Sequence, residues 1–144
     1  VFSNFATMAE LRLAVVEKAD ALYEAYIQKE VESGLYPAFK ASGMAYIRFA
    51  REEKQLFRLL YMRDLSNENH AETTEGYDRM LSIVQGSTGL DSATAKLFHL
   101  ESWAFVHGIA TMFATGYLDL DWELVSNMLT DAYMGLRKRY EEKE

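Results

Sequence analysis

The sequence predicts an all-α protein, a helical bundle of about six helices, and three observations lead to this prediction. Proline occurs once in 144 residues, whereas Met, Leu, Ala, Glu and Lys, which favour helices, are common. Apolar residues recur at steps of three and four, and no stretch alternates apolar and polar residues as a half-buried strand does. With 49% apolar residues, the chain is long enough to bury a sizeable core.

The first helix is expected from about Met8 to Glu32. Thr7 and Glu10 have the spacing of a capping box, in which a hydroxyl and a carboxylate each bind a free backbone amide. The segment 33–37 should end this helix, because Gly34 breaks it and Pro37 suits the first turn of the next one. One apolar stripe runs along the helix: Leu11, Val15, Ala19, Leu22 and Tyr26.

Three shorter helical segments are expected between residues 37 and 90. The first two cover about 37–51 and 55–64, with the charged cluster 51–54 as the joint between them. Helical spacing of apolar residues returns at 77–84, after a polar segment at 66–75. The run Gly86-Ser87-Thr88-Gly89 then breaks the chain.

The last two helices, about 91–117 and 121–140, are expected to pair two subunits. The first of them is apolar on nearly every side, so a single subunit can cover only part of it. Two such helices from each subunit would make a four-helix interface with two-fold symmetry. In the alternative interpretation, both helices belong to the core of a monomer. The expected interface residues are Ala104, Gly108, Thr111 and Thr115, followed by Leu124, Val125, Met128, Leu129, Ala132, Tyr133 and Leu136.

Charge and cysteine usage narrow the class of function. The net charge of −7 has the wrong sign for a domain that itself grips a phosphate backbone. The absence of cysteine rules out disulfides and fits a reducing compartment, so a cytoplasmic location is expected. The longest uncharged run, 102–118, is too short for a membrane span and fits a buried helix better.

Three short motifs lie in register along the chain, and the clearest is the W-x-x-x-H-G arrangement of the segment 103–108. This arrangement resembles that of the TetR-family transcriptional regulators whose C-terminal region is called the WHG domain. The segments 46–50 and 56–60 look like the second and third ligand-domain helices of that group, and 1–11 looks like its junction with the DNA-reading helix. The chain departs from the pattern at Asn4, Met8 and Lys54, where the family often has His, Lys and Pro. The change at Met8 removes a phosphate contact that the intact protein would otherwise make.

The resemblance implies a domain division and a function. Residues 1–6 would be the tail of a helix-turn-helix domain, and 7–144 the ligand-binding and dimerisation domain. The function implied is a homodimeric repressor that a small, mostly apolar ligand releases from operator DNA, with DNA contacted only through the missing N-terminal domain. The alternative is a helical dimerisation or interaction module without an effector.

The resemblance also implies a pocket between the middle helices and the helix that carries Trp103. Apolar walls with a few polar groups are typical of sites for lipophilic or aromatic effectors. His107 is expected either to bind the ligand or to bond within the helix pair, and Trp103 either to close the pocket or to fill the core. Glu101 either meets a cationic effector or is a surface acid. The expected lining is Tyr46, Phe49, Phe57, Tyr61, Met80, Val84, Phe98, Ser102, Trp103, Phe105, His107 and Met112.

Catalysis and metal binding find little support in the sequence. The three histidines, His70, His99 and His107, are scattered, and there is no pair of Glu-x-x-His motifs as in a di-iron bundle. No glycine-rich phosphate loop or nucleophile elbow is present. We therefore expect no enzyme, no metal and no cofactor.

Overall fold

Six α-helices and no strands make up the part of the chain that the structure describes, which confirms the all-α prediction. The structure is a computed structural model that describes residues 6–64, 66 and 73–142. The helices are α1 (Met8–Ser33), α2 (Ala38–Glu52), α3 (Lys54–Tyr61), α4 (Thr73–Thr88), α5 (Ser92–Ala114) and α6 (Trp122–Glu141). The predicted tail of a DNA-binding domain, 1–6, lies outside the described residues except for Ala6.

The helix ends follow the capping residues in the sequence. Thr7 accepts the amide of Glu10 at 3.1 Å, and the Glu10 carboxylate accepts the amide of Ala6 at 2.8 Å, one residue before the usual position in a capping box. Asp91 and Asp121 cap α5 and α6 through their carboxylates. Short polar side chains therefore set where three of the six helices begin.

Four boundaries differ from the sequence expectation, and the first is the start of α4 at Thr73, within the polar segment 66–75. The third helix ends at Tyr61 instead of continuing to about 64. Helix α4 continues through Gly86 to Thr88, because the chain turns only at Gly89, which has a φ of 73°. Helix α5 ends at Ala114 because Gly116 takes a φ of 71°, where other residues are strained.

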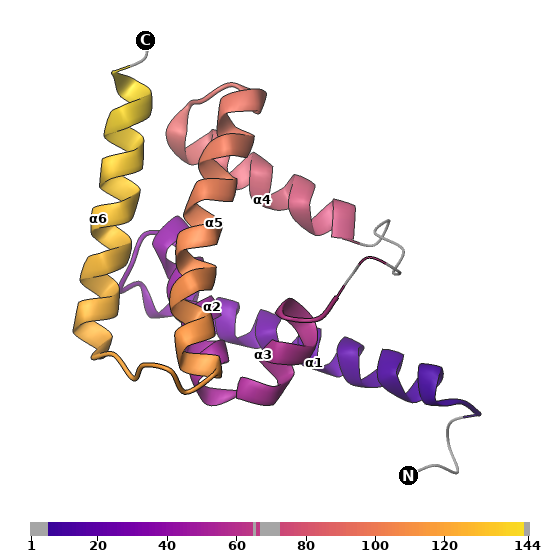
Figure 1. Cartoon of the computed structure of the whole chain (residues 1–144). Helices are drawn as coiled ribbons and strands as arrows, with labels where there is room; N and C mark the ends of the chain where they lie inside the picture. Colours follow the sequence, from indigo (N-terminus) through magenta and orange to yellow (C-terminus); the bar gives the residue numbers. More distant parts are fainter. Residues whose placement is uncertain (1–5, 65, 67–72, 143–144) are drawn as a thin grey trace.

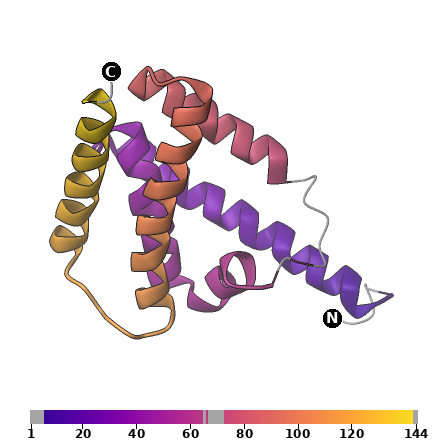
Figure 2. The same ribbon diagram turned by 45° about the horizontal axis from the view of Figure 1, so that its top comes forward.

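Helices α5 and α6 lie side by side and run in opposite directions, while α1 and α2 cross behind them (Figure 1). After a turn of the view, α4 still lies beside the first half of α5, and α1 still extends away from α6 (Figure 2). The N-terminal half of α1 leaves Met8, Leu13 and Val15 exposed, although Val15 belongs to the expected apolar stripe. The stripe is buried only where α1 crosses α2, at Ala19 and beyond.

The core has two clusters. The larger one joins α1, α2, α3, α5 and α6 around Phe49, Phe57 and Ile47, and the smaller one joins α4, α5 and α6 around Phe98. Beside the larger cluster, the Arg48 guanidinium donates to the buried Glu30 carboxylate at 2.6 Å. This ion pair fixes the end of α1 to α2.

Among the helices of the described residues, each is too short or too polar to span a lipid bilayer.

Candidate functional site

An apolar pocket lies between α2, α5 and α6, with one residue each from α1 and α4. It encloses about 90 Å³, which is below the roughly 300–1,000 Å³ of sites that hold drug-sized ligands. A small ligand therefore fits this arrangement, and a larger one needs the walls to move. The lining residues are Tyr23, Phe39, Lys40, Ser42, Gly43, Tyr46, Met80, His99, Ser102, Trp103, Phe105, Val106, Leu129, Ala132 and Tyr133.

Gly43 allows α2 to approach the other two walls closely. A Cβ at this position would lie 3.0 Å from Leu129 Cδ2 and 3.5 Å from Val106 Cγ2. The first distance is tighter than ordinary van der Waals contact, so the Leu129 side chain would have to shift by a few tenths of an ångström to admit a side chain here. The glycine thus leaves room for close packing of α2 against Leu129.

Three polar side chains in the lining differ in how their hydrogen bonds are satisfied. The Lys40 ammonium donates to Ser126 Oγ at 2.8 Å and to Thr130 Oγ1 at 2.7 Å, both on α6. Ser42 donates to the Phe39 carbonyl in its own helix. Ser102 Oγ is buried and has no hydrogen-bond partner, alone among the described buried side-chain polar atoms.

Trp103, His107 and Tyr46 form a connected set at one wall of the pocket. The Trp103 and His107 rings stack with their centroids 4.6 Å apart and their planes at 18°. Tyr46 Oη and His107 Nδ1 share a hydrogen bond of 2.7 Å. Burial lowers the pKa of His107 and raises that of Tyr46, so both rings are neutral near pH 7. His107 therefore contacts three rings of its own chain, those of Tyr46, Phe57 and Trp103, and positions two side chains of the wall.

The structure brings together five of the twelve residues expected in the pocket: Tyr46, Met80, Ser102, Trp103 and Phe105. The other seven lie elsewhere. Phe49, Phe57 and Tyr61 pack in an aromatic cluster with Tyr46, where the Tyr46–Tyr61 centroid distance is 4.9 Å. Val84 and Phe98 belong to the smaller core cluster. His107 lies directly behind the wall, and the half-buried Met112 is not part of the lining.

The sequence interpretation did not assign the α6 wall and Lys40 to the pocket. Leu129, Ala132 and Tyr133 were expected at a subunit interface, and the structure places them along the pocket. Both sides of α6 carry apolar residues, so periodicity does not separate them. Lys40 had a usable signal, because it is the only charged residue between Pro37 and Arg48.

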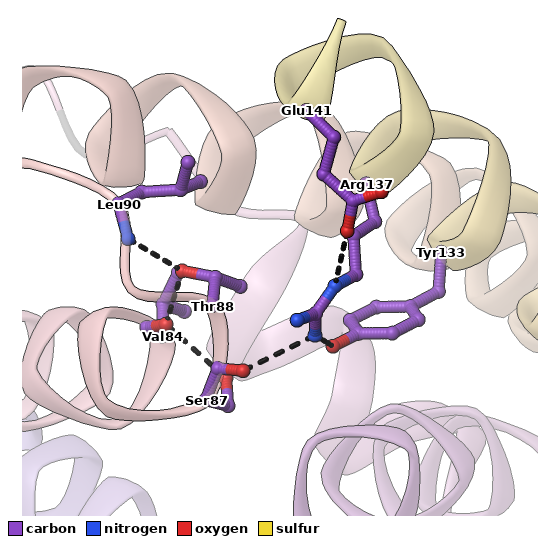
Figure 3. Close-up of polar contacts among 7 residues, drawn as sticks. All are labelled: Val84, Ser87, Thr88, Leu90, Tyr133, Arg137 and Glu141. Carbon is purple, nitrogen blue, oxygen red and sulfur yellow. Dashed lines mark hydrogen bonds and ion pairs between the residues drawn. The ribbon is translucent and has the colours of Figure 1, made fainter. Parts of the chain in front are cut away.

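A network of polar contacts joins α4 to α6 next to the pocket (Figure 3). Arg137 Nη1 donates to the Ser87 carbonyl and to Tyr133 Oη, each at 3.1 Å, and Arg137 Nε pairs with Glu141 at 3.1 Å. Because the Tyr133 ring lines the pocket, Arg137 ties this part of the wall to the end of α4.

The outer side of α5 is the main exposed apolar surface among the expected interface residues. Ala104 and Thr115 are exposed, and Gly108 and Thr111 are half-buried. Thr111 and Thr115 donate their hydroxyl hydrogens to carbonyls of their own helix at 2.8 and 2.7 Å, so they add no unsatisfied donor to this face. On α6, Leu124 is exposed, Met128 and Leu136 are half-buried, and Val125 is completely buried in the core of its own chain.

In the part of the chain described by the structure, no three His, Asp or Glu side chains gather as a metal site requires. Fold and site define an all-α domain with an apolar pocket and an exposed apolar helix face.

The comparison with protein families assigns this domain. Residues 39–132, nearly two thirds of the chain, match the family model described as "Tetracyclin repressor-like, C-terminal domain". The chain therefore belongs to this family, as its motifs indicated. The family is one of regulatory domains and not of enzymes. No curated protein and no solved structure matches the chain with significance.

Proposed function

We propose that this chain is the effector-binding and dimerisation domain of a TetR-like transcriptional repressor. A small, mostly apolar ligand fills the pocket between α2, α5 and α6 and thereby releases the intact protein from operator DNA. The operator is contacted through a DNA-binding domain outside the 144 residues. The pocket is the observation on which the proposal rests, because within a regulatory family an apolar site with few polar groups is suited to sensing a ligand.

The exposed side of α5 supports dimerisation. Leu97, Leu100 and Ala104 are exposed on successive turns, followed by the small residues Gly108 and Thr111. A Cβ added at Gly108 would meet nothing within 4 Å, so there is open space over this face in one subunit. A second copy of α5 can approach closely there, with α6 beside it.

Helix α1 supports the coupling of the pocket to DNA. Its second half packs on α2, and Tyr23 reaches the pocket lining. Its first half extends away from α6 and exposes apolar side chains (Figure 2). A ligand that changes the position of α2 therefore also moves the free end of α1. Binding favours release only if the ligand binds more tightly to the arrangement that does not fit the operator.

The test combines the oligomeric state with ligand screening. Sedimentation should show a dimer, and lipophilic compounds of low mass should raise the melting temperature and quench Trp103, whose side chain lies in the pocket wall. Trp122→Phe should keep the quenching and Trp103→Phe should remove it. A stable monomer whose melting temperature no such compound alters would contradict the proposal.

The alternative function is a dimerisation module without an effector. It predicts the same dimer but no thermal shift with any compound. An added methyl group at Gly43 contacts Leu129 and Val106 of the lining, so in an effector domain Gly43→Ala should reduce the thermal shift, whereas the alternative gives no shift with or without this change.

A further inference from the structure

We propose that the pocket selects acids: its ligand is an apolar molecule that carries one carboxylate, and the Lys40 ammonium is the charge partner of that group. This inference rests on the proposed function, because it specifies the chemical class of ligand for the same pocket.

The hydrogen bonds of Lys40 leave its charge without a counterion. Its ammonium has three N–H donors, and Ser126 and Thr130 on α6 accept two of them at 2.8 and 2.7 Å. The ring of Tyr36 lies 4.8 Å away on another side. No carboxylate of the described residues forms an ion pair with Lys40. The two hydroxyls hold the ammonium in place but do not neutralise it, so one donor remains for an anion.

The rest of the described lining contains no opposing charge. The chain has 22 acidic residues against 15 basic ones, yet no Asp or Glu is among the lining residues. His99 is the histidine of the lining, and burial lowers its pKa below the ordinary value, so it stays uncharged at pH 7. Lys40 is therefore the charged residue of the described lining at pH 7. An anion is attracted and a cation is repelled.

The position of Lys40 fixes how an acid would bind. Lys40 is half-buried on α2 and lines the pocket, and its ammonium bonds two α6 hydroxyls that are not lining residues themselves. The apolar body of the ligand packs against Phe39, Trp103 and Phe105, and its carboxylate accepts the third N–H bond of Lys40. Since the same ammonium bridges α2 to Ser126 and Thr130 on α6, the acid also changes the connection between these helices.

The experiment compares head groups on two constant apolar bodies. Octanoate, 1-octanol and octylamine form one series, and 3-phenylpropionate, 3-phenylpropanol and 3-phenylpropylamine form the other. Isothermal titration at pH 7 should give the acid at least about tenfold tighter binding than the alcohol, and the amine the weakest binding, in each series that binds. The advantage of the acid should shrink with added salt, whereas binding of the alcohol should not.

Three variants connect the preference to Lys40. Lys40→Met keeps the length and apolar stem and should remove the acid's advantage without weakening the alcohol. Lys40→Arg should keep the preference, because the charge remains. Lys29→Met, at an exposed position of α1 outside the lining, is the matched control and should change nothing. Circular dichroism checks that each variant is folded; if Lys40→Met does not fold, Lys40→Arg and the salt dependence decide the outcome.

The possible results separate the two proposals. If the alcohol or the amine binds as tightly as the acid, or if Lys40→Met weakens all head groups equally, acid selection is overturned while the pocket remains a ligand site. If no compound of either series binds, acid selection is overturned. In that case the broader thermal-shift screen decides whether the effector function fails as well.

Discussion

The two sides of α5 have similar apolar composition but different surroundings. On the inner side, Phe98, Ile109 and Phe113 are buried against α2, α4 and α6. On the outer side, Leu97 and Leu100 are about half exposed, and Ala104 has no cover. An apolar helix face contributes to stability only when another surface covers it. The comparison indicates that the inner side holds the subunit together, whereas the outer side is available for a second subunit.

Replacing a phenylalanine on the inner side should have the largest effect. Phe98 is completely buried, so Phe98→Ala leaves a cavity and should lower the free energy of unfolding by about 3–5 kcal/mol. Phe105 lies on the same helix but is 38% exposed, and Phe105→Ala should cost about 1 kcal/mol. Urea unfolding of both variants measures the difference. Equal losses in the free energy of unfolding would show that another surface buries Phe105 in solution.

Filling the outer side should affect association and leave the folded subunit intact. A side chain at Gly108 meets open space within the subunit, and leucine has a higher helix propensity than glycine. The subunit should therefore stay folded. In the dimer, however, the leucine would overpack the expected interface, which costs roughly 1–3 kcal/mol. Gly108→Leu should thus raise the dissociation constant of the dimer by at least about tenfold. Sedimentation across a concentration series measures this change.

The control for this variant is Gly86→Leu, at an open position of α4 that is not among the expected interface residues. It should leave the dimer unchanged. If Gly108→Leu also leaves the dimer unchanged, the interface lies on another surface.

The pH dependence of the free energy of unfolding tests whether α5 keeps its two histidines buried. Burial lowers the pKa of both His99 and His107 below the ordinary value of 6.5. Between the lowered native pKa and 6.5, the unfolded chain binds more protons than the native one, so acid favours unfolding. The free energy of unfolding should thus be constant above about pH 7 and fall as the pH decreases through 6.5 and below.

Chemical denaturation at several pH values measures this slope. The double variant His99→Gln and His107→Gln should have a shallower slope between pH 7 and 5. An unchanged slope would mean that neither imidazole is held in its neutral form.

The smallest effect is expected at the unsatisfied hydroxyl of the pocket. Ser102→Ala removes a buried oxygen without a partner, so the stability should stay the same or rise by up to about 1 kcal/mol. Ser42→Ala, the matched variant in the same pocket, removes a hydroxyl that donates to Phe39 and should cost about 1 kcal/mol. A clear loss with Ser102→Ala would show that a water or another group satisfies this hydroxyl.

Local signals predicted the elements of the fold well. Thr7 caps α1 as expected, and Asp91 and Asp121 cap α5 and α6, because a cap depends only on residues within one turn. The end of the third helix was less predictable. Arg63 donates to carbonyls at the end of α3 after the helix has stopped at Tyr61, although the helical pattern of the sequence continues.

The pocket could be predicted only in part. Trp103, Ser102 and Tyr46 were found through their resemblance to a family motif and their aromatic character. Lys40 and Tyr133 were missed, because a lysine in the first turn of a helix ordinarily faces solvent and a tyrosine between apolar residues suits an interface equally well. The assignment of Lys40 and Tyr133 to the pocket depends on packing between distant helices. Lys40, for example, donates to Ser126 and Thr130, which lie more than eighty residues further along the sequence.

By itself, the sequence determined the all-α class, the six helices, most of their ends and the family to which the chain belongs. Only the tertiary structure decided which apolar faces form the core, which line the pocket and which remain exposed. The physical reason is that the 3.6-residue period identifies a face only on a helix with a polar side. Helix α5 is apolar all round, so the helices packed against it determine which of its faces are buried and which stay exposed.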